Sequence, residues 1–162
     1  MAKIILGIDP GIADTGYGVI KVERGQLVCL AYGTIKTSAQ ADLITRLEVL
    51  HQELDKIIKK YQPNLAAIEQ LFFNKNVRTA LIVGQARGVV LLTLKQNKLA
   101  IIDYTPSQVK QAVAAYGQAS KTQVQKMVKL MLNLKELPRP DDAADALAIA
   151  ICALNFPLCQ KN

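Results

Sequence analysis

The stretch that decides the fold lies at residues 4–11 and reads IILGIDPG. Its apolar run is short and nearly continuous, which is typical of a strand buried on both faces of a sheet. Asp9, Pro10 and Gly11 then form a strong turn signal. We therefore expect a buried strand that ends at an acidic side chain.

The rest of the chain supplies further strands and helices around this one. Strand patterns follow at residues 17–22 and 27–35, with Arg24 and Gly25 as the turn of a hairpin. The later expected elements, in chain order, are a helix at 41–61, a strand at 65–69, a helix at 77–94, a strand at 100–103, and helices that begin near residue 106, at residue 120 or 122, and at residue 141. The order βββαβαβ followed by helices predicts an α/β fold with a five-stranded mixed sheet flanked by helices.

Length and composition indicate one globular unit. With 162 residues, 51% of them hydrophobic, we expect a single domain at 1–158 and a short tail at 159–162. The longest apolar stretch, at 146–154, is too short to cross a membrane, and no leader pattern opens the chain. We therefore expect a soluble, cytoplasmic protein with no membrane partner.

The sequence also predicts where two cysteines and the single histidine lie. The cysteines lack zinc-type spacing, and Cys29 and Cys152 lie in apolar runs that predict buried thiols. The single histidine, His51, falls on the polar side of the helix at 41–61 and is expected at the surface.

Positive charge is concentrated in the middle of the chain. Residues 70–135 hold ten Lys and Arg residues and one acid, Asp103, for a net charge of +9, whereas the remainder carries −2. This distribution favours nucleic acid or another phosphate-rich partner, although a solvated basic face gives the same pattern.

Acidic residues stand where strands and a helix meet the expected core. Asp9 and Glu69 each end an apolar strand, and a carboxylate there is costly unless it is paired or binds a cation. Asp142 and Asp145 are three residues apart and share a helix face, and Asp141 nearly shares it. Asp145 precedes the apolar run at 146–151 and must approach the core, so a metal ion is its most economical partner.

The ligand types indicate which metal this is. Carboxylates without a helpful His or Cys favour Mg²⁺, with Mn²⁺ as a substitute. A carboxylate cluster beside a basic segment fits phosphodiester hydrolysis with two ions in each site. Spacing alone does not decide between Asp141 and Asp142.

Several motifs together resemble the RuvC family of Holliday junction resolvases. The motifs, in family order, are GIDPG at 7–11 with TGYG at 15–18, IEQ at 68–70 with FFNKN at 72–76, GQARG at 84–88, YTP at 104–106 with VK at 109–110, and DAADALA at 142–148. Each is weak alone, but the set covers nearly the whole chain. The resemblance implies a ribonuclease H-like fold and a homodimer that cuts a four-way DNA junction in recombination and repair, with RuvA and RuvB as branch-migration partners.

The resemblance also assigns roles to residues. It implies that Asp9, Glu69, Asp142 and Asp145 are the catalytic, metal-binding carboxylates, which leaves Asp141 as a helix-capping acid. The DNA contacts that we expect are Phe72 or Phe73, one of which stacks on bases, together with Lys75, Arg78, Lys110 and Lys121. The dimer face that we expect on the apolar helix at 77–94 comprises Val77, Leu81, Gly84 and Gly88. A helix that is apolar on most sides is also compatible with packing wholly inside one chain.

Three other functions compete with junction cleavage. One is a ribonuclease H-like nuclease with another nucleic-acid substrate, and one is a junction-binding protein without catalysis. A third is an ATP-handling protein of the actin and sugar-kinase type, because residues 9–16 resemble a phosphate-binding hairpin. Those enzymes need two such domains, and this chain has room for one.

Overall fold

The computed structural model describes residues 2–71 and 77–155, and it is built on one five-stranded sheet. The strands, in the spatial order of the sheet, are β3 (Gln26–Lys36), β2 (Asp14–Glu23), β1 (Lys3–Asp9), β4 (Leu65–Glu69) and β5 (Ala100–Tyr104). The first three are antiparallel to one another, whereas β4 runs parallel to β1 and to β5. The mixed sheet and the βββαβαβ order are therefore confirmed.

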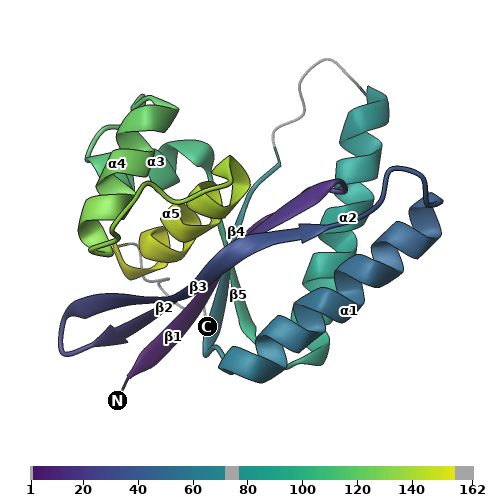
Figure 1. Ribbon diagram of the computed structural model, residues 1–162, viewed down its shortest axis with the longest axis horizontal. Helices are drawn as coiled ribbons and strands as arrows, with labels where there is room; N and C mark the ends of the chain where they lie inside the picture. Colours follow the sequence, from purple (N-terminus) through teal and green to yellow (C-terminus); the bar gives the residue numbers. More distant parts are fainter. Residues whose placement is uncertain (1, 72–76, 156–162) are drawn as a thin grey trace, which may run out of the picture.

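Helices cover both faces of the sheet (Figure 1). One face carries α1 (Leu43–Tyr61) and α2 (Val77–Gln96), and the other carries α3 (Pro106–Ala114), α4 (Lys121–Met131) and α5 (Asp141–Asn155). Among the described residues, no helix combines the length and apolar character needed to cross a bilayer.

The strand β1 is buried on both faces, as its sequence predicts. Ile5 packs in the core shared with α3, α4 and α5, whereas its neighbour Leu6 packs in the core shared with α1 and α2. Both side chains are fully buried, because alternate residues of a strand point to opposite faces. Two separate cores therefore hold the carboxyl end of β1 in place.

Capping residues fix where the helices begin. Thr105 caps α3 with Pro106 at its first position, as expected. Ser120 caps α4, which decides between the two starts that the sequence left open. Each cap is a capping box, in which the side-chain oxygen of a glutamine three residues later accepts a hydrogen bond from the amide of the capping residue.

Two expectations about burial need correction. His51 is half-buried, and its Nδ1 lies 2.8 Å from the Thr93 Oγ1, so it links α1 to α2 and is not a free surface residue. Cys152 is buried as expected, but Cys29 is only partly buried, because β3 forms an edge of the sheet.

Candidate active site

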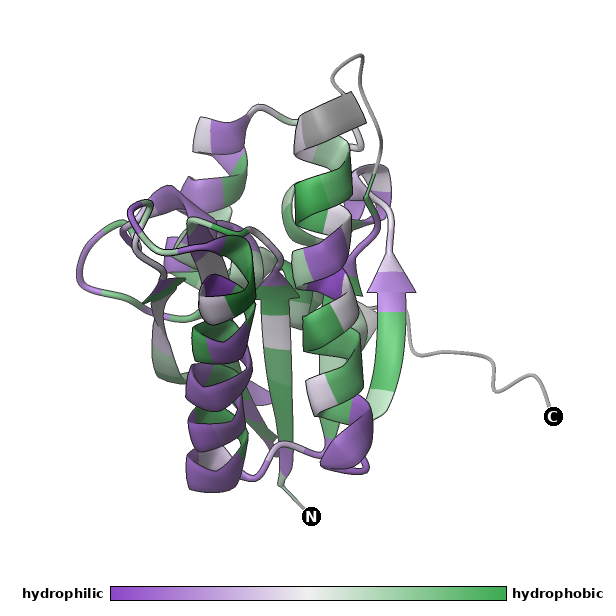
Figure 2. Cartoon of the chain, turned by 90° about the vertical axis from the view of Figure 1, so that its right-hand side faces the viewer, coloured by the Kyte–Doolittle hydropathy of each residue, from purple (hydrophilic) through white to green (hydrophobic). Residues whose placement is uncertain are grey.

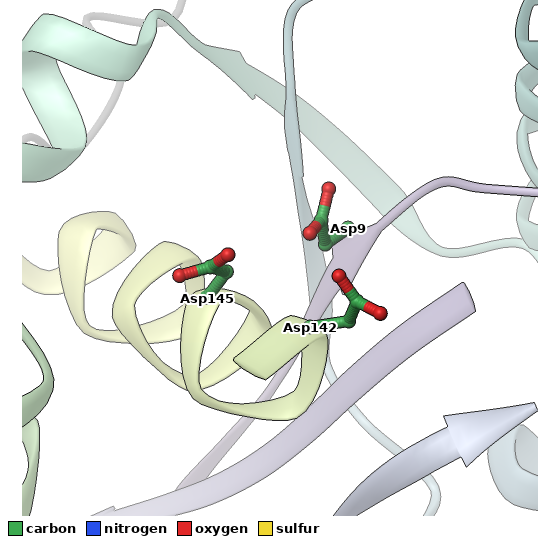
Figure 3. Close-up of side chains that lie close together, drawn as sticks. All are labelled: Asp9, Asp142 and Asp145. Atoms are coloured by element: carbon green, nitrogen blue, oxygen red, sulfur yellow. The ribbon is translucent and has the colours of Figure 1, made fainter. Parts of the chain in front are cut away.

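Three carboxylates converge at the end of β1. Asp9 is the last residue of that strand, and Asp142 and Asp145 lie in the first turns of α5. One oxygen from each lies within 4.8 Å of the others, and Figure 3 shows the three side chains gathered between the strand and the helix. The spacing of three residues places both α5 acids beside Asp9, as the sequence predicts.

Glycines on β1 and β2 allow α5 to approach the sheet this closely. A Cβ added to Gly16 would lie 2.0 Å from the Asp142 carbonyl oxygen, and one added to Gly7 would lie 2.0 Å from the Ala146 carbonyl oxygen. At Gly18 the same atom would meet Leu147 at 2.8 Å. The sequence analysis gave these glycines no role, although two glycines at alternate positions of a strand share one face and indicate a close backbone neighbour.

The turn after Asp9 is tied to the sheet. The Thr15 hydroxyl is buried and donates a hydrogen bond of 2.5 Å to the Gly11 carbonyl oxygen. The Gly11 amide in turn approaches the same hydroxyl oxygen at 3.4 Å. These contacts hold the chain that follows Asp9 against β2.

Glu69 stands beside Asp9 but outside the group of three. Ile8 of β1 pairs with Ile68 of β4 in parallel register, so the acids that follow them emerge at the same edge of the sheet. Glu69 lines a cavity of about 240 Å³ together with Asp145, Lys110 and Lys121. The structure thus brings all four predicted acids to one edge, with Glu69 on the cavity side.

Crowded carboxylates shift one another's ionisation. Burial, followed by the charges of Glu69, Asp145 and Asp142, raises the pKa of Asp9 from 3.8 to about 7. Burial and then the charge of Asp145 raise the pKa of Glu69, whose lysine neighbours oppose the shift. Asp9 therefore holds a proton at a pH where an ordinary aspartate is ionised.

Both predicted lysines face the acids. The Lys121 Nζ lies 2.9 Å from the Asp145 Oδ2 and 3.5 Å from the Asp141 Oδ2. Burial lowers the pKa of Lys121, but the hydrogen bond and charge of Asp145 outweigh it, and the net shift is upward. Lys110 lines the cavity beside Glu69.

Asp141 makes contacts beyond the capping role that was expected. It is the first residue of α5, but the contacts of its carboxylate within the described chain run to Gln125, Lys121 and Arg139. These partners lie on α4 and in the preceding turn. Spacing along one helix carries no information about such contacts between helices.

The expected DNA-contact and dimer residues fall partly outside the description. Phe72, Phe73 and Lys75 lie outside the described residues, and Val77 and Arg78 are placed only as backbone in the first turn of α2. Leu81 is 64% exposed, and a Cβ added to Gly84 or Gly88 would meet nothing within 4 Å. These glycines therefore make no close contact with another helix within the described part of one chain.

The basic segment does not form a single surface. Arg87 pairs with Asp103 at 2.5 Å and is largely buried. Lys95 lies at the end of α2, and Lys98 lies just before the start of β5. Glu69 lies at the other end of the parallel strands β4 and β5, next to the last residue of β5. The cations of this segment therefore lie on several faces of the molecule, and those beside the acids, Lys110 and Lys121, come from α3 and α4.

The site has the ligands of a hard divalent cation. Its donors are carboxylate oxygens, the ligand type that Mg²⁺ and Mn²⁺ prefer. Two oxygens bound to one Mg²⁺ are at most about 4.2 Å apart, which is twice the metal–oxygen distance. One oxygen from each of the three residues lies within 4.8 Å of the others, which is close to that range.

Comparison with known proteins identifies the family. A family model described as "Crossover junction endodeoxyribonuclease RuvC" matches residues 5–153. The protein of that name from Halothermothrix orenii is 54% identical over 149 residues, which cover 92% of this chain and 90% of the relative. Its counterpart in Caldicellulosiruptor saccharolyticus is 55% identical over 149 residues, 91% of this chain and 90% of that one.

A solved structure agrees with these relatives. The Thermus thermophilus RuvC in complex with a Holliday junction substrate superimposes with a TM-score of 0.91 at 37% identity. The match covers 95% of this chain and 94% of that one. The ribonuclease H-like fold predicted from the resemblance is confirmed, and the sugar-kinase alternative is excluded. From the matched residues and the shared fold, we conclude that the chain belongs to the RuvC family of crossover junction endodeoxyribonucleases.

Proposed function

We propose that this protein resolves four-way DNA junctions by metal-dependent hydrolysis at Asp9, Glu69, Asp142 and Asp145. The observation that carries the proposal is the convergence of three carboxylates within 4.8 Å from elements far apart in the sequence. Such a cluster opposes folding through charge repulsion unless protons or a bound cation neutralise it. Family membership supplies the reaction class.

The metal is Mg²⁺ in this proposal, with two ions in each site and Mn²⁺ as a substitute. When bound, the metal would lower the pKa of a water molecule so that hydroxide can attack phosphorus, and it would neutralise negative charge on the phosphate. Asp9, Asp142 and Asp145 would hold it, and Glu69 would complete the set from the cavity side. The raised pKa of Asp9 supports this assignment, because burial and then repulsion between the acids raise it, and a cation at that position would offset both.

The lysines beside the acids bind the phosphate in this scheme. Lys110 and Lys121 line the same cavity as Glu69 and Asp145, so a phosphodiester there would contact cations and acids together. Lysine ammonium groups orient the phosphate oxygens and offset charge that develops during cleavage. Most of the affinity should come from phosphate contacts and therefore weaken as salt rises.

The substrate is inferred from a relative. The T. thermophilus protein has been solved with a Holliday junction, and its fold matches along nearly the whole chain. By resemblance, Phe72 or Phe73 stacks on bases at the junction centre, and Lys75 and Arg78 contact the strands beside it. Stacking is worth about 1–3 kcal/mol per base and tolerates any sequence.

A homodimer is the assembly that the exposed face of α2 favours. Leu81, Gly84, Gly88 and Leu92 follow helical spacing, and Leu81 and Leu92 are 64% and 57% exposed. Figure 2 shows apolar bands on α2 where the neighbouring α1 is mainly polar. A two-fold dimer would present two sites to a junction of matching symmetry. The partnership with RuvA and RuvB rests on family resemblance.

The test uses a synthetic four-way junction and a linear duplex of the same arms, each with Mg²⁺ or with EDTA. We expect paired, symmetric nicks in the junction only, and only with Mg²⁺. Asp145→Asn should abolish cutting and retain junction binding, whereas Asp55→Asn, which also neutralises an ion-paired aspartate, should cut normally. Equal cutting of both DNAs would support a general nuclease, and binding without any cutting would support a non-catalytic binder.

A further inference from the structure

Lys121 is shared between two aspartates of α5. Its ammonium lies 2.9 Å from the Asp145 Oδ2 and 3.5 Å from the Asp141 Oδ2. Asp145 belongs to the group of three carboxylates, whereas Asp141 does not. One lysine thus joins a carboxylate inside the metal-binding group to a carboxylate outside it.

A buried amide fixes the outer carboxylate. Gln125 is only 9% exposed, and its Nε2 donates a hydrogen bond of 3.0 Å to the Asp141 Oδ1. Gln125 follows Lys121 by four residues, so both side chains leave the same face of α4. Asp141 is therefore anchored on one oxygen and presents the other to the lysine.

The second cationic neighbour of Asp141 contributes little. The Arg139 Nη1 lies 3.6 Å from the Asp141 Oδ1, and the Arg139 side chain is 74% exposed. An ion pair that solvent reaches so freely is screened and costs side-chain entropy. The pairing that matters for Asp141 is the one with Lys121.

A cation on Asp145 competes with Lys121 for the same carboxylate. Repulsion between the ammonium and such a cation would drive the lysine away from Asp145. Without another acceptor, a flexible lysine would be lost to solvent and would no longer meet the phosphate. Asp141 offers an acceptor on the same helix, one turn from Asp145.

We propose that Asp141 is a positioning residue for Lys121, which accepts the ammonium when a divalent cation takes Asp145 and keeps it at the mouth of the site. This inference rests on the proposed function, because it assumes a cation at Asp145 and a phosphate beside Lys121. Asp141 contacts neither the cation nor the phosphate itself. The pair of acids then acts as two successive partners of one lysine.

The first test separates turnover from binding in steady-state cleavage of the junction. We expect Asp141→Asn to lower kcat about tenfold, with KM within about twofold of the wild type, because misplacing a catalytic group lowers turnover. Asp141→Glu should recover most of the loss. If Asp141 only stabilised the helix dipole, Asp141→Asn would instead lower Tm and leave kcat unchanged. Asp55→Asn is the matched control, because Asp55 also pairs with a lysine, Lys59, and accepts from an amide, Asn97.

The second test measures Mn²⁺ binding by calorimetry without DNA, in a double-mutant cycle with Lys121→Met. If Asp141 acts through the lysine, Asp141→Asn should weaken Mn²⁺ binding about fivefold in the wild type. In the Lys121→Met background, the change should fall below about twofold. Equal weakening in both backgrounds would indicate simple long-range attraction and would overturn the inference.

The two proposals fail in different ways. If the wild type binds Mn²⁺ and cuts junctions but Asp141→Asn matches it in kcat, only the positioning role is wrong. If the wild type neither binds Mn²⁺ nor cuts, both proposals are wrong.

Discussion

The helices α5 and α2 are both rich in apolar residues, yet they are used differently. From residue 143 to 153, every α5 residue except Asp145 is buried, because the sheet lies on one side and α3 and α4 on the other. In contrast, α2 leaves Leu81 and Leu92 more than half exposed. An apolar helix therefore indicates burial, but the burying surface can lie within the chain or on a second molecule.

Glycines mark the same difference. Those opposite α5, at Gly7, Gly16 and Gly18, admit its backbone so closely that a Cβ would clash with it. Those on α2, at Gly84 and Gly88, face open space. The first contact is complete and places two of the proposed catalytic acids, whereas the glycine face of α2 meets no other element within the described residues.

The largest effect should come from removing an acid at the α5 contact. Asp9→Asn or Asp145→Asn should lower junction cleavage by at least about 10³-fold, because each removes a ligand of the proposed cation. Cleavage rates and gel-shift affinities would be measured together. Junction affinity should hold or improve, since less negative charge faces the phosphates. Normal cleavage by both variants would rule out this cluster as the active site.

Next in size is a charge on the exposed face of α2. Leu81→Glu should weaken dimerisation about 100-fold, because a carboxylate would be buried at the interface. Sedimentation equilibrium measures the dimer constant. Ile44→Glu on α1 is the control, since Ile44 is 79% exposed and should tolerate the charge. An unchanged dimer constant for Leu81→Glu would place the interface elsewhere.

A pair of glycine substitutions tests the two contacts side by side. Gly16→Ala should lower the free energy of unfolding by about 2–3 kcal/mol and reduce cleavage, because its Cβ would lie 2.0 Å from the Asp142 carbonyl oxygen. Gly84→Ala should raise the stability of the monomer by about 0.5–1 kcal/mol, since alanine favours helix. Urea unfolding at low protein concentration measures both. Equal destabilisation by the two substitutions would contradict the distinction between the contacts.

The smallest effect concerns pH. Because the pKa of Asp9 is raised from 3.8 to about 7, the folded protein binds more protons than the unfolded chain between these values. Stability of the metal-free protein should therefore fall as pH rises from about 4 to about 7. Mg²⁺ should raise Tm more at pH 8 than at pH 5, where protons compete with it. Asp9→Asn should flatten the pH dependence of Tm, and an unchanged slope in that variant would show that another group is responsible.

Local patterns predicted much of this molecule. The strand at residues 4–8, the Thr105 cap with Pro106 and the shared face of Asp142 and Asp145 each follow from a few neighbouring residues. The choice of Asp142 over Asp141 came from family resemblance. Contacts between distant elements were not predictable, because they depend on how helices cross.

Three contacts illustrate that limit. His51 meets Thr93 across α1 and α2, Arg87 meets Asp103 across α2 and β5, and Gln125 meets Asp141 across α4 and α5. In each pair, at least one residue is of a polar type that usually lies at the surface. Periodicity identifies which face of a helix is apolar, but not which polar side chain stands opposite.

The central claim is that each subunit carries one site built on α5 and that two subunits join through α2. The most direct test is to identify the DNA products, linear or nicked circular, that form from a supercoiled plasmid with an extruded cruciform. Wild-type dimers should make paired incisions and yield linear DNA. Co-refolded mixtures of wild type and Asp145→Asn should yield nicked circles from dimers with one working site. Linear product without nicked circles from such mixtures would contradict the claim, since paired incision would then not need a working site in each subunit.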